Sequence, residues 1–170
     1  MIFGNPKELA IECFIDEISN NISYGRLAIL AKELYIGDIS MLVILNTPVT
    51  FFNESLKYCG QRYYHLFNEM NSQKIWNFLY LALYNDPDSY DNNADWKTMI
   101  DNKIDYQKFS IFTNFSECFD GEIAFLVEND YEEKLIWQDF ESKMIQEISL
   151  AKGTYQSVVE SLIAYFTTVR

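Results

Sequence analysis

The sequence has few of the residues that build catalytic and metal centres. Its 170 residues include one histidine, His65, and three cysteines, Cys13, Cys59 and Cys118. A zinc site needs Cys or His ligands in close pairs, and no two of these four residues are that close. A thiol protease would need His65 to meet a cysteine through folding, and we interpret His65 as a core or helix-surface residue. The odd number and wide spacing of the cysteines are typical of reduced, mostly buried thiols.

Glycine, proline and long apolar runs are also scarce. The six glycines are scattered and form neither G-x-x-x-x-G-K nor G-x-G-x-x-G, which excludes the common phosphate-binding loops. No apolar run reaches the roughly 18 residues that a membrane-spanning helix needs. Glu8 and Glu12 interrupt the N-terminal segment before an apolar region develops, so we expect no secretion signal and a cytoplasmic location.

Basic residues are few, and this limits the possible partners. Thirteen Lys and Arg stand against 25 Asp and Glu, which gives a formal net charge of -12. Direct binding to nucleic acid or to an anionic membrane needs a basic surface, so both are excluded as unaided activities. An acidic surface instead suits a basic protein partner, because opposite charges raise the encounter rate.

The apolar content predicts a folded chain despite this charge. Hydrophobic residues make up 49% and aromatic residues 16% of the sequence, which is outside the range of disordered proteins. We expect one domain that spans residues 1–170.

Alternating apolar residues predict an antiparallel meander over residues 8–37. The pattern has period two at residues 9–15, at residues 27–31 after Tyr24-Gly25, and at residues 34–36 before Gly37-Asp38. One face of this meander needs a cover, which the following segments supply.

Two helices are predicted next. Thr47 and Pro48 are typical N-cap and N1 residues for a helix that ends before Gly60. A second helix fits residues 72–84, with Asn71 or Ser72 as its cap and Asp86-Pro87 beyond its end.

A second run of strands follows residue 106, with period two at residues 109–113, 123–127 and 135–137 and a further strand at residues 144–150. Lys152-Gly153-Thr154 then opens a last helix that Thr154 can cap. Segregated runs of strands and helices indicate an α+β fold, with an antiparallel sheet packed against two to four helices.

Two acidic segments are candidate contact sites. The first follows the second helix and contains YNDPDSYDNNADW, and the second is ENDYEE, a predicted loop between strands. Aromatic residues among carboxylates are typical of an interface with a basic protein. The candidate contact residues are Tyr84, Asp86, Asp88, Tyr90, Asp91, Asp95, Trp96, Glu128, Asp130, Tyr131, Glu132 and Glu133.

Other interpretations of these carboxylates stay open. Asp91, Asn93 and Asp95 match the start of a calcium loop, but Trp96 and Asn102 stand where that loop needs glycine and glutamate. A carboxylate- or metal-dependent hydrolase is possible, although the sequence does not single out a pair of acids. A solvated loop or a general scaffold would also explain them. We therefore predict no cofactor, no metal ligand and no catalytic residue.

Segments at both ends of the chain resemble a known family. MIFGNPKELAIECFI, GRLAILAKELYIGD leading into LNTPVTFF, and EKLIW followed by EISLAKGTYQSVVESL are similar to bacterial immunity protein family 42, and residues 84–118 lie outside the resemblance. Such proteins belong to polymorphic toxin and contact-dependent growth inhibition systems. The resemblance implies a small α+β protein, not an enzyme, that binds the C-terminal domain of its cognate toxin and occludes the active site or substrate groove. Many such toxins are basic nucleases, which suits an acidic inhibitor.

Overall fold

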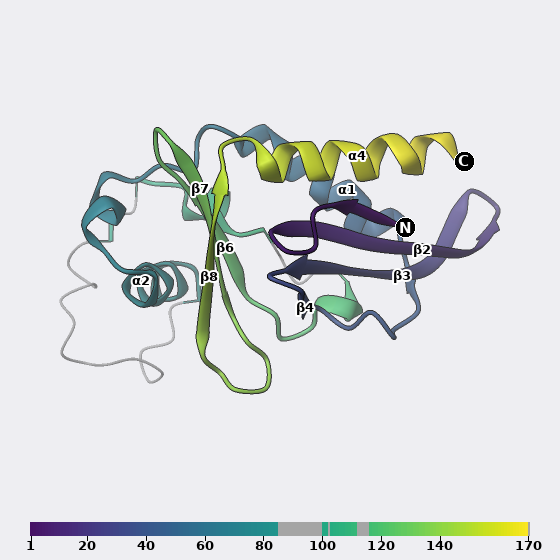
Figure 1. The fold of residues 1–170 in the computed structure, drawn as a ribbon, viewed down its shortest axis with the longest axis horizontal. Helices are drawn as coiled ribbons and strands as arrows, with labels where there is room; N and C mark the ends of the chain where they lie inside the picture. The colour runs from purple at the N-terminus through teal and green to yellow at the C-terminus, as the bar shows by residue number, and fades with distance from the viewer. Residues whose placement is uncertain (85–99, 102, 112–115, 170) are drawn as a thin grey trace.

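Two antiparallel sheets organise the chain. The computed structural model describes residues 1–84, 100–101, 103–111 and 116–169, and Figure 1 shows the arrangement. The N-terminal sheet contains β1 (Ile2–Gly4), β2 (Leu9–Ser19), β3 (Ile22–Ala31), β4 (Leu34–Ile36) and β5 (Val43–Ile44). The central sheet contains β6 (Ala124–Glu128), β7 (Glu132–Gln138) and β8 (Ile145–Ala151). Strand order is β1-β2-β3-β4 in the first, with β5 also on β3, and β6-β7-β8 in the second.

The predicted meander is confirmed. In the β2–β3 pair, Leu9 faces Ala31 and Ile11 faces Ile29, and all four side chains are buried because the period-two pattern places them on one face. Asn20 and Asn21 make the turn with positive φ angles of 51° and 65°. Asparagine tolerates this conformation, which matches the twist of a two-residue hairpin.

Helices cover the buried face of the N-terminal sheet. The α-helices of the described chain are α1 (Asn46–Ser55), α2 (Ser72–Tyr84) and α4 (Thr154–Thr168), and the short 3-10 helices are η1 (Leu56–Tyr58), η2 (His65–Glu69), η3 (Tyr106–Phe109) and η4 (Glu117–Phe119). Helix α4 lies along β1, β2 and α1 (Figure 1). Its buried stripe of Val158, Val159, Leu162 and Phe166 joins the core below it, as its apolar spacing predicts.

The central sheet separates two cores. Alternate residues of a strand point to opposite faces, so Leu126 and Leu135 join the core under α4, whereas Phe125 and Ile136 join a second core under α2. Figure 1 shows α2 on the side of this sheet opposite β2 and β3. The second core is rich in aromatic rings, including Phe67, which packs edge to face on Phe78 and Phe109.

Several predicted helix starts are confirmed or corrected. The α2 start is confirmed, because Asn71 Oδ1 accepts a hydrogen bond from the Lys74 N–H at 2.9 Å. Thr47 does not cap α1, because the helix begins at Asn46 and its N-cap residue is Leu45, two residues earlier than predicted. Thr154 does not cap α4, because its hydroxyl donates instead to the Ala151 carbonyl at 2.6 Å. Both threonines lie inside their helices rather than before them.

The strand expected at residues 109–113 is wrong over its described part. Helix η3 occupies Tyr106–Phe109, and Ser110 forms a single isolated bridge to Phe125. Residues 112–115 lie outside the described part of the chain. The described apolar residues of this segment serve both cores instead. Tyr106 and Phe109 pack against the rings of the second core from a 3-10 turn, and Ile111 joins the core under α4. No helix in the described ranges has the length and apolarity needed to cross a membrane.

Candidate interaction surface

The predicted contact residues fall into two groups. Asp86, Asp88, Tyr90, Asp91, Asp95 and Trp96 lie outside the described residues. Tyr84 is described and is the last residue of α2, with 40% of its surface exposed. Its ring lies 5.0 Å from that of Tyr80, and burial raises the pKa of its hydroxyl while a hydrogen bond with Ser110 opposes the shift. Tyr84 is therefore fixed at the end of the helix from which the first acidic segment leaves.

The second predicted group forms the hairpin between β6 and β7. Glu128 ends β6 and Glu132 begins β7, so residues 129–131 make the turn. Asp130 and Tyr131 are exposed, and Glu132 is half-buried. Glu128 and Glu133 are buried, and the structure corrects their interpretation as surface contacts because both carboxylates have partners inside the protein.

Glu128 pairs with Arg62, which is closed to solvent. The Arg62 Nη1 atom lies 3.4 Å from Glu128 Oε1, and the Arg62 carbonyl accepts the Glu128 backbone N–H at 2.8 Å. The guanidinium also donates to the Lys108 carbonyl at 2.8 Å and to the Ser55 carbonyl at 2.9 Å. Buried charge is tolerated only when it is paired and hydrogen-bonded, and Arg62 meets both conditions.

Glu133 holds the start of α4. Its two carboxylate oxygens accept the backbone N–H groups of Gly153 at 2.7 Å and Tyr155 at 3.0 Å. These N–H groups have no partner within a helix, and a negative charge there is favoured by the helix dipole. Glu133 thus performs, from a strand distant in sequence, the capping role predicted for Thr154.

The turn between the two buried glutamates is closed by its own hydrogen bonds. Asn129 Oδ1 accepts the N–H groups of Tyr131 at 2.8 Å and Glu132 at 2.9 Å, and the Asn129 N–H donates to the Glu132 carbonyl at 3.0 Å. Lys152 Nζ donates to the Asn129 carbonyl at 3.2 Å. The turn therefore presents Asp130 and Tyr131 from a fixed backbone.

A small hollow lies beside this turn. Its volume is about 170 Å³, and it separates the hairpin from η2 and α2. Phe67, Met70 and Val127 give it an apolar part, and Asn68, Glu132 and Lys134 give it a polar part. The exposed turn and the hollow together make an uneven surface with an aromatic projection, a form suited to contact with a protein.

A second acidic surface was not predicted from the sequence. A groove of about 540 Å³ lies between the end of β4, η4 and the β7–β8 turn. We call it the acidic groove, and the carboxylates that line it are Asp38, Glu117, Asp120, Glu122, Asp139 and Glu141. None of them forms an ion pair with another described residue. These acids come from three separate segments, so only the fold brings them together.

Burial affects the ionisation of one groove residue in particular. Glu122 is half-buried, and desolvation raises the pKa of its carboxyl, with Asp139 adding to the shift. The Gly37 N–H, which donates to Glu122 Oε1 at 3.3 Å, and Lys143 oppose it. Glu122 therefore holds its negative charge at some energetic cost.

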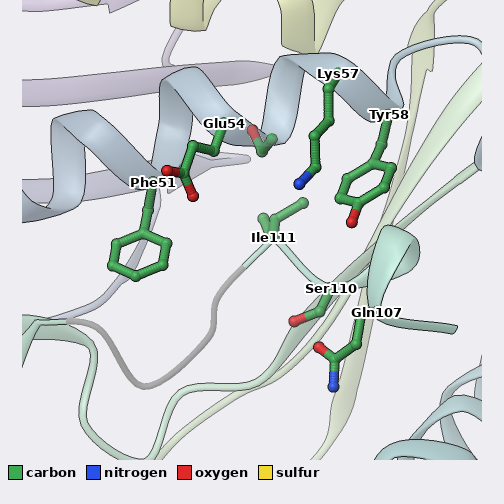
Figure 2. Close-up of a pocket in the computed structure, with 8 residues that line it drawn as sticks. Phe51, Glu54, Lys57, Tyr58, Gln107, Ser110 and Ile111 are labelled. Atoms are coloured by element: carbon green, nitrogen blue, oxygen red, sulfur yellow. The ribbon is translucent and has the colours of Figure 1, made fainter. Parts of the chain in front are cut away.

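Figure 2 shows a third hollow, between α1 and the segment after η3. Glu54, Lys57 and Tyr58 extend from the helical side, and Ser110 and Ile111 lie opposite them. Its volume of about 130 Å³ is below the range of about 300–1,000 Å³ that is typical of small-molecule sites. We assign it no ligand.

The histidine and cysteines weighed for catalysis or metal binding lie in different parts of the fold, and Cys118 lines the acidic groove. His65 is exposed at the start of η2, and Cys13 and Cys118 are buried as free thiols. Burial raises the pKa of Cys13 to about 11, which disfavours the reactive thiolate. The described residues contain no group of three His, Cys, Asp or Glu side chains arranged for a metal ion.

The fold and its surfaces define a small α+β protein with two antiparallel sheets, an acidic groove and a projecting acidic turn. The chain belongs to the Immunity protein 42 family (Imm42), whose family model matches residues 1–165. Its fold is similar to the crystal structure of CdiI from Burkholderia dolosa AUO158, with a TM-score of 0.71 and 20% sequence identity over 97% of this chain and 99% of that one. No curated protein matches the chain.

Proposed function

We propose that this immunity protein protects its cell by binding the C-terminal domain of a cognate toxin and covering the toxin's active site or substrate groove. Membership of Imm42 is the observation that carries the proposal. The protein acts in the cytoplasm as a stoichiometric inhibitor rather than as an enzyme. Inhibition of this kind needs a surface and no reacting group.

The charge of the protein supports a basic toxin domain, and we infer a nuclease. A formal net charge of -12 favours association with a positive surface, and nucleases need such a surface to hold a phosphate backbone. An acidic inhibitor can occupy the same surface in place of the nucleic acid.

The proposed contacts come from both acidic segments. The first contributes Tyr84, Asp86, Asp88, Tyr90, Asp91, Asp95 and Trp96. The second contributes Asp130 and Tyr131, which are exposed, and Glu132, which is half-buried. The backbone beneath that turn is anchored by Glu128 and Glu133.

Co-expression tests the function. Cells that produce the toxin domain encoded beside this protein should survive only when this protein is also produced, and the two purified proteins should form a complex. If the purified proteins do not associate at micromolar concentration, direct neutralisation is refuted. Nuclease assays on the free toxin domain test the inferred activity separately.

Charge reversal tests the contact surface. Asp130→Lys with Glu132→Lys, and separately Asp86→Lys with Asp88→Lys, should slow association and weaken its dependence on salt, because rim charges act mainly on the encounter rate. Glu17→Lys is a control for charge reversal elsewhere, because Glu17 is exposed on β2, which belongs to the other sheet. Equal association rates for all variants would exclude both segments as contacts.

A further inference from the structure

We propose that Tyr131 is the anchor of the toxin interface and that its ring stacks on an arginine or lysine side chain of the toxin, with Asp130 and Glu132 pairing the same positive region. This inference rests on the proposed function.

The exposure of Tyr131 sets it apart from the other large apolar side chains. Tyr131 is 87% exposed, whereas the next most exposed large apolar residue in the described chain, Met144, is 62% exposed. Within the described part of the chain, no ring or cation stacks on Tyr131. An aromatic ring that does not contribute to the core of its own protein is available to a partner, and tyrosine is enriched at the centres of interfaces.

The backbone under Tyr131 is already in a fixed conformation. Both arms of the hairpin are tied to the protein interior, one through Glu128 to Arg62 and the other through Glu133 to the start of α4. The Asn129 side chain closes the turn between them. Little backbone entropy is then lost on binding, and a tyrosine side chain has only two rotatable angles to order. Preorganisation of this kind directs more of the contact energy into affinity.

Charge selects the group that meets the ring. Asp130 and Glu132 flank Tyr131, and neither carboxylate has an ion-pair partner within the described residues. The face of an aromatic ring attracts a cation, and adjacent carboxylates strengthen the preference for positive charge. Arginine fits best, because its planar guanidinium stacks on a ring while its N–H groups reach a carboxylate. The inferred toxin has a net basic surface, so such a side chain is available.

Three substitutions at one position test the contact. Tyr131→Ala should weaken binding to the toxin domain by at least about 30-fold, the effect typical of an interface hot spot. Tyr131→Phe should keep an affinity for the toxin domain within about 3-fold of that of the original protein, because the ring face remains. Tyr131→Leu keeps apolar area but has no ring, and its affinity should be about 10-fold lower.

The comparison variant is Tyr35→Ala, because Tyr35 is 50% exposed and lines the acidic groove instead, where its hydroxyl donates to Glu12 Oε2 at 2.6 Å. Thermal unfolding of each variant confirms that the fold is retained, since an exposed side chain contributes little to stability. In a second step, each lysine and arginine of the toxin domain is replaced by alanine. One of these toxin substitutions should weaken binding to the original protein but cause no further loss of affinity for the Tyr131→Ala variant.

Unchanged binding of Tyr131→Ala would overturn the inference, and a loss confined to Tyr35→Ala would transfer the anchor to the acidic groove. Either result leaves the proposed function intact, because the original protein would still bind. Failure of the original protein to bind the toxin domain would refute the proposed function itself. Equal losses for Tyr131→Ala and Tyr131→Phe would show that the hydroxyl, and not the ring, makes the contact.

Discussion

Arg62 and Glu128 form an ion pair that is closed to water. Their side chains are 0% and 3% exposed, and the Nη1 and Oε1 atoms lie 3.4 Å apart. Arg62 follows η1, and Glu128 ends β6, so the pair joins the α1 side of the molecule to the central sheet. The Arg62 guanidinium also lies 5.1 Å from the ring centre of Tyr155 in α4. One side chain therefore connects three elements that are distant in sequence.

Breaking this pair should be costly. Glu128→Gln or Arg62→Met leaves the remaining charge buried without its partner, and each should lower the free energy of unfolding by about 3–5 kcal/mol. Urea denaturation measures the change. The double variant should recover part of the loss, because an apolar replacement of a whole buried pair is often neutral. The exposed pair between Arg26 and Asp16 is the control, and Asp16→Asn should cost less than about 1 kcal/mol.

Removal of the Glu133 carboxylate should loosen α4. Glu133→Ala leaves the N–H groups of Gly153 and Tyr155 without their acceptors, which should cost about 1–3 kcal/mol in unfolding free energy. Hydrogen exchange at these two amides should also become faster. Glu132→Ala, one residue away and half-buried, should change stability by less than about 0.5 kcal/mol. If both variants had the same effect, the capping role of Glu133 would be disproved.

Glu122 should make stability depend on pH in the mildly acidic range. Burial raises the pKa of this carboxyl, so the folded protein holds the proton more tightly than the unfolded chain. Stability then increases as pH falls through the folded pKa, and the gain is complete below the unfolded value of about 4.3. Glu122→Gln should raise the melting temperature at pH 7, and the difference should vanish near pH 4. Glu117→Gln, an exposed groove residue, controls for the loss of one charge.

Tyr155 should make the fold sensitive to alkali. Burial raises the pKa of its hydroxyl to about 12, above the value of about 10 in an unfolded chain. The contribution is fully present below pH 10 and is lost as pH rises toward 12, at up to about 1.4 kcal/mol per pH unit. Tyr155→Phe should reduce the slope of the unfolding free energy against pH in this range by up to about 1.4 kcal/mol per pH unit, which corresponds to one proton. Burial also raises the pKa of Tyr106 to about 12, so the Tyr155→Phe variant should keep a pH slope of similar size that comes from Tyr106.

Local patterns were enough to predict most of the fold. The alternation at Leu9, Ile11 and Cys13 and the apolar stripe of α2 are consequences of period alone, and the structure confirms both. The strand expected near Phe109 was wrong because apolar residues of a 3-10 turn can fill a core without pairing. Period-two patterns this short do not distinguish these cases.

The roles of individual acids depended on contacts that the sequence does not display. Glu128, Asp130, Glu132 and Glu133 form one acidic run, but Arg62 and the start of α4 remove two of them from the surface. The acidic groove draws on residues as distant as Asp38 and Asp139, so no local pattern indicates it. Tyr131 was a candidate from its acidic neighbours alone, and the structure adds its exposure and its fixed backbone.

The position of α4 across β1 and β2 also has a consequence for synthesis on the ribosome. Strands β1 and β2 are synthesised before α4, with which they share a core. Part of their apolar face therefore stays uncovered until residues 154–168 have left the ribosome. We expect this core to close only when α4 docks, after all three strands of the central sheet have been made.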